Sequence, residues 1–171
     1  MKMEMKHNLK RNQAIETVRT KTDRAPQLKA GVRRWGRIMT QSYISPKPIT
    51  NYVSGHLDLT VEEFNAHYRP AFDEALARGD SFVVGDARGT DSMTQNYLLG
   101  KTTAVVVYHM FTTPRNNAGF KTLGGFLSDE ERDAQMTADS DQDIAWVRLG
   151  REKSGTQKNI DRRRQNSALQ K

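Results

Sequence analysis

Residues 82–91 combine the residue types that bind phosphate groups in proteins. They read Phe-Val-Val-Gly-Asp-Ala-Arg-Gly-Thr-Asp, an apolar run that stops at Gly85 and turns through small and polar residues. This pattern is typical of a strand, loop and helix junction, where backbone N–H groups lack partners and Gly85 and Gly89 let a phosphate approach. A second junction of this kind occurs at Ser154-Gly155-Thr156. Together the two loops predict a nucleotide held between them.

Charged side chains in these loops supply the candidate chemistry. Arg88 and Arg115 could form paired hydrogen bonds with phosphate oxygens, and the alternative for each is a surface arginine paired with a nearby carboxylate. Asp86 could hold a ribose hydroxyl or act as a base, and the position of Asp91 is also one that a helix dipole favours. We take Asp86 and Asp91 as the candidate catalytic carboxylates.

Histidines and metal-binding patterns give a weaker indication. His56 follows a predicted strand and is open to either an acid–base or a structural role, whereas His109 lies within a strand pattern and favours a structural one. Asp139, Asp141 and Asp143 alternate but lack the glycine and final glutamate of a calcium loop, which favours a turn. The chain has no cysteine and no HExxH spacing, so we expect neither a metal nor a cofactor.

The elements that must position these residues alternate between strand and helix. Strands are predicted at 49–54, 81–84, 103–111 and 144–147, and the continuous β-branched run of the third indicates burial on both faces. Helices are predicted from Thr60 to Gly79 with a kink or break at Pro70, over 90–99, over 128–138 and from Ser154 onward. Residues 112–127, rich in glycine and asparagine, read as a long loop.

This order predicts an α/β fold with a Rossmann-like, open and mostly parallel sheet flanked by helices. In such sheets ligands bind at the carboxyl ends of the strands, where the glycine-bearing loops would converge. The predicted ligand-binding and phosphate-binding residues are Ser54, Gly55, His56, Gly85, Ala87, Arg88, Gly89, Thr90, Arg115, Ser154, Gly155 and Thr156.

Charge divides the chain differently. Lys and Arg outnumber Asp and Glu by 11 to 3 in residues 1–45 and by 7 to 2 in 151–171, whereas 46–150 have 9 against 15. We therefore expect a basic, partly disordered arm with a short helix over 1–45, the nucleotide-binding domain over 46–165, and a polar tail over 166–171. A basic end could bind nucleic acid, an acidic partner or the acidic domain itself. The candidate nucleic-acid-binding residues are Arg33, Arg34, Trp35, Arg37, Arg162, Arg163 and Arg164.

The loop at 85–91 resembles the glycine, arginine, glycine and acidic pattern of the SLOG superfamily, which includes DNA-processing protein A and the Lonely guy phosphoribohydrolases. Ser154-Gly155-Thr156 is similar to the loop that those proteins place under a phosphate, and the resemblance covers roughly residues 49–165. It implies a Rossmann-like domain that binds a nucleotide or nucleotide-derived ligand. Lonely guy enzymes follow this loop with a catalytic glutamate, whereas Gln157, Lys158, Asn159 and Ile160 follow Thr156 here.

The sequence is compatible with two classes of function. The first is binding of a nucleotide-like small molecule, with cleavage or transfer at an N-glycosidic bond as the reaction if the protein is an enzyme. The second is a nucleic-acid-binding or structural assembly protein that uses its basic ends, with a homo-oligomer as a further possibility. No apolar run is long enough to span a bilayer and the N-terminus is charged, so we expect a cytoplasmic protein without membrane contact.

Overall fold

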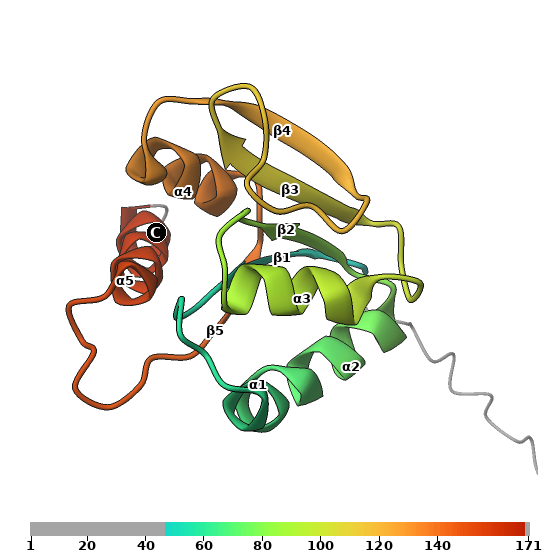
Figure 1. Ribbon diagram of the computed structural model, residues 1–171. Coiled ribbons are helices and arrows are strands. Elements are labelled where there is room, and N and C mark those ends of the chain that lie inside the picture. The colour runs from blue at the N-terminus through green and yellow to red at the C-terminus, as the bar shows by residue number, and fades with distance from the viewer. Residues whose placement is uncertain (1–46, 170–171) are drawn as a thin grey trace, which may run out of the picture. The chain divides into compact units, whose positions relative to one another are not determined.

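The described part of the chain forms a five-stranded sheet whose strands all run parallel. A computed structural model describes residues 47–169 and gives the strand order β4-β3-β2-β1-β5. Helices flank the sheet on both sides (Figure 1). The predicted Rossmann-like α/β class is therefore confirmed. The predicted arm over 1–45 lies outside the described residues.

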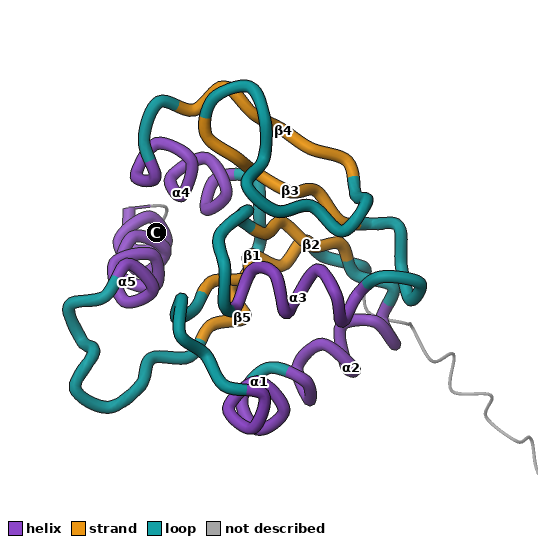
Figure 2. Tube along the Cα trace, viewed as in Figure 1, coloured by secondary structure: helices purple, strands orange, loops and turns teal. Residues whose placement is uncertain are grey.

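The chain alternates between the two kinds of element for most of its length. The strands are β1 (Thr50–Ser54), β2 (Ser81–Val84), β3 (Val105–Met110), β4 (Lys121–Phe126) and β5 (Gln142–Ala145). The helices are α1 (Val61–His67), α2 (Arg69–Arg78), α3 (Thr90–Leu98), α4 (Asp129–Ala138) and α5 (Gly155–Leu169). Because the strands are parallel, the loops that follow β1, β2 and β5 emerge at the same end of the sheet (Figure 2).

Local sequence signals explain where the first helices begin and end. Thr60 caps α1 by accepting a hydrogen bond from the Glu63 N–H at 3.2 Å, and the Glu63 carboxylate accepts one from the Thr60 N–H at 3.0 Å. Pro70 lies at the start of α2, so the predicted break separates two helices. Gly79 then ends α2 with a φ of 77°, a conformation that glycine adopts without strain.

Two predicted segments differ from the structure in particular. The expectation that residues 112–127 form only a loop is wrong, because Lys121–Phe126 pair with β3 as the strand β4. The last strand occupies Gln142–Ala145 rather than 144–147. Helix α5, which the sequence predicts from Ser154 onward, continues to Leu169. Backbone pairing with a neighbouring strand decides both strand differences, and residue propensity alone does not reveal it.

The core has two parts, one on each face of the sheet. On one face, Phe64, Phe72 and Leu98 of α1, α2 and α3 pack against strand residues such as Val53 and Val84. On the other face, a smaller cluster joins Tyr52, Val83 and Tyr108 to Met136 of α4. Val53 and Tyr52 are neighbours in β1 and point to opposite faces, as alternation in a strand requires. The sheet is therefore covered on both sides, as parallel sheets generally are.

Candidate functional site

A crevice opens at the carboxyl ends of the central strands. It has a volume of about 590 Å³ and lies between the loops that follow β1 and β2 and the helices α4 and α5. Most predicted ligand-binding residues line it, together with one predicted carboxylate: Ser54, Gly55, His56, Ala87, Arg88, Asp91, Arg115, Ser154, Gly155 and Thr156. Four other predicted residues, Gly85, Asp86, Gly89 and Thr90, are not among the residues that line it. The loops after β1, β2, β3 and β5 thus all contribute residues to one cavity.

Ser54 ends β1 inside this crevice. Its side chain is 6% exposed, yet its hydroxyl oxygen has no hydrogen-bond partner among the described residues. Buried hydroxyl groups in folded proteins nearly always have a partner, because an unpaired polar group costs free energy away from water. Ser54 also lines the cavity, so its unpaired hydroxyl is a candidate hydrogen-bonding group for a ligand.

The first turn of α5 borders the same cavity. Ser154 precedes the helix, and its hydroxyl accepts a hydrogen bond from the Gln157 N–H at 3.3 Å. No acceptor among residues 47–169 takes the N–H groups of Gly155 and Thr156. Gly155 is exposed and a side chain added there would meet no atom within 4 Å, whereas Thr156 is buried. Free N–H groups and the helix dipole together favour an anion at this position.

The start of α3 offers fewer free hydrogen-bond donors to a ligand, because some of its N–H groups already have acceptors within the protein. The Thr90 N–H and hydroxyl both donate to the carbonyl of His56 at 3.1 Å. The Ala87 N–H donates to the Asp91 carboxylate at 3.0 Å. Arg88 remains exposed at the crevice and has no ion-pair partner among the described residues. The loop after β2 therefore offers a free guanidinium, and its backbone serves mainly to hold the loop.

Glycines fasten the loops after β1 and β2 to each other. A Cβ atom at Gly89, whose φ is 73°, would lie 2.4 Å from the His56 carbonyl oxygen. A Cβ atom at Gly55 would lie 2.2 Å from the Thr90 hydroxyl. These distances are shorter than any tolerable contact, so both positions require glycine. Gly85 has a related role, since a Cβ there would lie 2.4 Å from a carboxylate oxygen of Asp91.

Asp86 is the centre of a buried ion-pair group. Its carboxylate is 1% exposed and accepts hydrogen bonds from the Arg115 guanidinium at 2.6 and 3.2 Å and from the Arg115 N–H at 2.8 Å. Arg132 approaches it at 3.4 Å. Burial alone would raise the pKa of Asp86, but the hydrogen bonds from Arg115 outweigh it and hold the pKa below its ordinary value. Asp86 is therefore a fixed anion that orders the loop containing Arg115.

Asp91 has the opposite electrostatic character. It lies in the first turn of α3, is partly buried and lines the crevice. Burial raises its pKa to about 7, against the hydrogen bond from Ala87 and the charge of Arg132, which act to lower it. A carboxyl group with such a pKa can accept or donate a proton near neutral pH. Of the two predicted catalytic carboxylates, only Asp91 faces the cavity.

Helices α4 and α5 contribute four polar residues that the sequence did not assign to the site: Asp129, Arg132, Asp133 and Asn159. Arg132 is 7% exposed and pairs with Asp133 and Asp129, each at 2.8 Å. Asn159 donates hydrogen bonds to the Tyr52 hydroxyl at 2.7 Å and to Asp133 at 3.1 Å. Burial raises the pKa of Tyr52 well above its ordinary value, so its hydroxyl stays protonated. The adjacent pair Arg132-Asp133 was visible in the sequence, but nothing in the spacing connected it to Tyr52 or Asn159.

The two histidines of the sequence reasoning both have structural contacts. The Nε2 atom of His56 accepts a hydrogen bond from the Arg148 N–H at 2.9 Å, which links the loops after β1 and β5. Burial and the charge of Arg148 lower the pKa of His56, in keeping with a neutral ring in this position. His109 is 3% exposed, and its ring lies beneath Gly124 of β4. The structural interpretation of His109 agrees with this placement.

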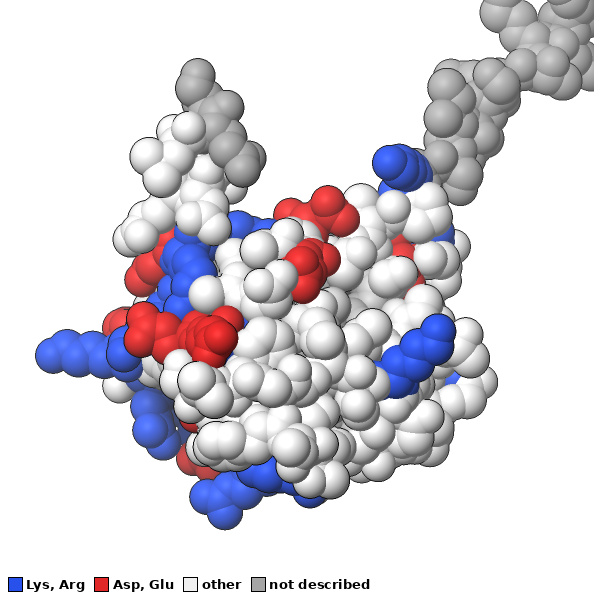
Figure 3. Space-filling view, turned by 90° about the horizontal axis from the view of Figure 1, so that it is seen from above, with Lys and Arg blue, Asp and Glu red and all other residues white. Residues whose placement is uncertain are grey.

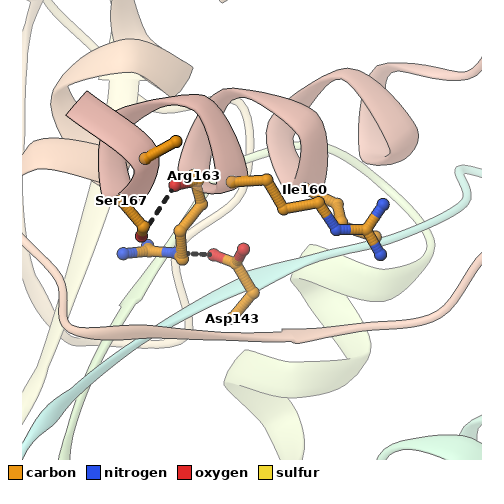
Figure 4. A pocket seen from close by; sticks show the side chains of 6 residues that line it. Asp143, Ile160, Arg163 and Ser167 are labelled. Atoms are coloured by element: carbon orange, nitrogen blue, oxygen red, sulfur yellow. Dashed lines mark hydrogen bonds and ion pairs between the residues drawn. The ribbon is translucent and has the colours of Figure 1, made fainter. Parts of the chain in front are cut away.

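The arginines proposed for nucleic acid are mostly engaged within the protein. Arg163 pairs with Asp143 at 2.8 Å and donates to the Ser140 carbonyl at 2.8 Å, and Figure 4 shows it turned toward Asp143 beneath α5. Arg162 donates to the Asn159 side chain at 2.7 Å. Arg164 alone is largely exposed, at 73% of its side chain. The other candidates, Arg33, Arg34, Trp35 and Arg37, lie outside the described residues.

Comparison of the chain with models of known protein families, with curated proteins and with solved structures gave no match. Within residues 47–169, no group of three His, Asp or Glu side chains could hold a metal ion. Asp139, Asp141 and Asp143 instead bind separately, to the Tyr108 hydroxyl, the Thr50 N–H and Arg163. Among the described helices, none combines the length and the apolar composition needed to cross a bilayer.

Proposed function

We propose that the crevice binds a nucleotide or a nucleotide derivative through its phosphate. The observation that carries this proposal is the buried Ser54 hydroxyl, which has no partner and belongs to a residue that lines the crevice together with Gly155 and Thr156, whose N–H groups have no acceptor among the described residues. A phosphate oxygen accepts hydrogen bonds from hydroxyl and N–H groups alike. One bound phosphate would therefore satisfy both sets of donors.

The remaining wall suits the nucleoside part of such a ligand. Asp91, Asp133 and the Tyr52 hydroxyl are polar groups of the crevice that could bind sugar hydroxyls, and Arg88 adds a positive charge at its edge. A purely anionic ligand would meet repulsion from these carboxylates. The resemblance of residues 85–91 and 154–156 to SLOG proteins supports the same ligand class, since both loops border the cavity.

The reaction that we propose for this site is cleavage or transfer at an N-glycosidic bond. Asp91 is the carboxylate for it, because it faces the cavity and its pKa of about 7 allows it to activate water or to stabilise a positively charged sugar. Asp86 is unsuited to either role, since Arg115 and Arg132 occupy its oxygens. Binding is the primary proposal, and turnover depends on it.

Calorimetry with a matched pair of variants tests the binding. The ligands would be AMP, ADP-ribose and NAD⁺, with adenosine as the ligand that lacks phosphate. Ser54→Ala removes the free hydroxyl without breaking a hydrogen bond of the protein, so we expect unchanged stability and binding of phosphate-bearing ligands weakened about three- to tenfold. Thr94→Ala is the control, because Thr94 has the other buried hydroxyl without a partner and does not line the crevice.

Two results would overturn the proposal: no binding by any ligand of the panel, or equal affinities for the Ser54→Ala and Thr94→Ala variants. Turnover is measured separately, as free base released from the bound ligand and separated by chromatography. Asp91→Asn is expected to abolish base release while leaving ligand affinity within a few-fold of the original. Base release by this variant at the original rate would exclude Asp91 from the chemistry.

A further inference from the structure

The strand β4 forms an open edge of the sheet. It pairs with β3 on one side, and no described strand pairs with its other side. Five of its six residues are exposed, and Phe126 is partly buried. Exposed edge strands readily associate with another chain unless charge, proline or irregular backbone prevents it. Lys121 is the only charged residue of β4, which contains no proline.

Large apolar side chains are exposed on β4 and directly beside it. Leu123 is 43% exposed, Leu127 is 78% exposed, and Phe111 at the end of β3 is 59% exposed. Phe111 also has a φ of 57°, a left-handed conformation that is uncommon for a bulky side chain and costs on the order of 1 kcal/mol. Figure 3 looks down on the side of β4 and shows a broad, mainly uncharged surface with most of the charged groups toward its edges. A strained, exposed aromatic residue in such a surface indicates contact with a partner.

Opposite charges flank β4 in the chain. Lys121 begins β4, and Glu130 belongs to the first turn of α4, which follows β4 closely in the chain. Both side chains are exposed, and neither forms an ion pair with any residue in 47–169. The neighbouring acids are engaged, because Asp129 pairs with Arg132 and Glu131 accepts a hydrogen bond from the Leu127 N–H. Lys121 and Glu130 are thus free to pair with charges of another molecule.

We propose that the β4 surface, defined as Phe111, Lys121–Leu127 and Glu130, binds the same surface of a second copy of this chain. A two-fold axis through the middle of β4 runs the two strands antiparallel and brings Lys121 of each copy beside the end of β4 in the other. Glu130 then lies near the Lys121 of the partner, and the two lysines lie at opposite ends. The apolar side chains meet between them.

Self-complementarity is the reason for choosing a second copy as the partner. A surface with one positive end and one negative end matches itself when it is turned by half a rotation, which is the requirement for an isologous dimer. The backbone limits hydrogen bonding between the two β4 strands, because a bulge near Gly125 interrupts the regular strand edge. Side-chain contacts, rather than a continuous ladder of hydrogen bonds, therefore supply most of the binding.

Charge reversal on the full chain tests this arrangement, with native mass spectrometry and analytical ultracentrifugation as readouts. The wild-type protein is expected to dimerise at about 100 μM, and Lys121→Glu or Glu130→Lys is expected to weaken dimerisation about tenfold or more. An equimolar mixture of the two variants should regain dimers, because each cross-contact then joins one Glu and one Lys. The double variant should also recover.

The controls are Glu74→Lys on α2 and Lys158→Glu on α5, which make the same charge changes at exposed positions outside the β4 surface. They are expected to dimerise like the wild type, and circular dichroism checks that every variant folds. A monomeric wild type, weakening by the controls, or failure of the mixed variants to form heterodimers would each overturn the proposal. The proposal would also be overturned if the charge-reversal variants left self-association unchanged and instead lost binding to a different protein.

Discussion

Asp86, in the loop after β2, and Asp91, in the first turn of α3, lie close together in the chain and have opposite electrostatic roles. Asp86 is ionised and surrounded by arginine, whereas burial raises the pKa of Asp91 to about 7. Environments that move two pKa values apart are typical of sites where one group transfers protons and the other fixes charge. The backbone hydrogen bond from Ala87 holds Asp91 in place without removing its ability to titrate.

The raised pKa of Asp91 makes stability depend on pH in a defined direction. Between pH 3.8 and about 7 the folded protein retains a proton that the unfolded chain has released, so this group lowers the free energy of unfolding as pH rises through that window. Asp91→Asn removes the dependence. We expect the variant to gain about 1 kcal/mol or more relative to wild type between pH 4 and pH 8, measured by urea denaturation.

Glu74→Gln serves as the control for Asp91→Asn, because Glu74 is exposed on α2 and has no ion-pair partner among the described residues. Its difference from wild type should stay constant over the same pH range. If the Asp91→Asn difference were equally constant, Asp91 would not titrate near neutral pH in the folded protein. The acid–base role proposed for it would then be lost.

At the scale of elements, β4 depends on one close contact. The ring of His109 lies directly beneath Gly124, so that a Cβ atom at residue 124 would be 2.1 Å from the His109 Cε1 atom. His109 is 3% exposed and therefore has little room to move. Position 124 therefore requires glycine because a larger side chain would not fit. Position 125 favours glycine because its φ is 98°.

Gly124→Ala should consequently destabilise the fold by about 1–3 kcal/mol through overpacking against His109. Gly155→Ala is the matched control for stability, because nothing lies within 4 Å of an added Cβ at that position. Urea midpoints of the two variants provide the measurement. Equal midpoints would mean that β3 and β4 separate easily enough to admit the methyl group.

The same region shows why the sequence predicted some elements and missed one. The run 103–111 is apolar and rich in β-branched residues, and this composition alone predicts a buried strand. Lys121–Phe126 has two glycines and is exposed, so its pairing with β3 arises from tertiary contact rather than propensity. Capping pairs such as Thr60 with Glu63 act locally, which is why the helix starts were predicted well.

The candidate site likewise contains residues that the sequence predicts and residues that only tertiary packing brings together. Ser54, Arg88 and Ser154 follow strands or precede helices, and parallel topology alone brings such positions to one end of the sheet. Asp133 and Asn159 enter the cavity only because α4 and α5 pack against each other on one face. Sequence spacing carries no information on that packing. The pairing of Asp86 with Arg115 likewise depends on the path of the β3–β4 loop.

At the scale of the whole molecule, one sheet supports both parts of the core. Phe72 belongs to the cluster under α1, α2 and α3, and Met136 to the cluster under α4, while Val83 and Val84 are neighbours in β2 that face opposite clusters. Because every central strand contributes to both faces, neither cluster can open without exposing the other side of the same strands. We therefore expect residues 47–169 to unfold as one cooperative unit.

Two core truncations measure this cooperativity. Phe72→Ala should cost about 3–5 kcal/mol and Met136→Ala about 2–5 kcal/mol, since both side chains are almost fully buried. Each variant should lower the midpoint of the same single transition, followed by circular dichroism and by amide exchange, with an unchanged denaturant slope. A second transition in either variant would show that the two faces of the sheet unfold separately.

The interlocked glycines at Gly55 and Gly89 have a consequence for how this crevice can be altered. Gly89 lies against the backbone of the loop after β1, Gly55 lies against the Thr90 side chain, and the His56 carbonyl accepts both hydrogen bonds that Thr90 donates at the start of α3. A new ligand specificity grafted into one loop alone would leave the other loop clashing or without its partners. For protein engineering, the loops after β1 and β2 are therefore a single exchangeable part, to be transplanted together or not at all.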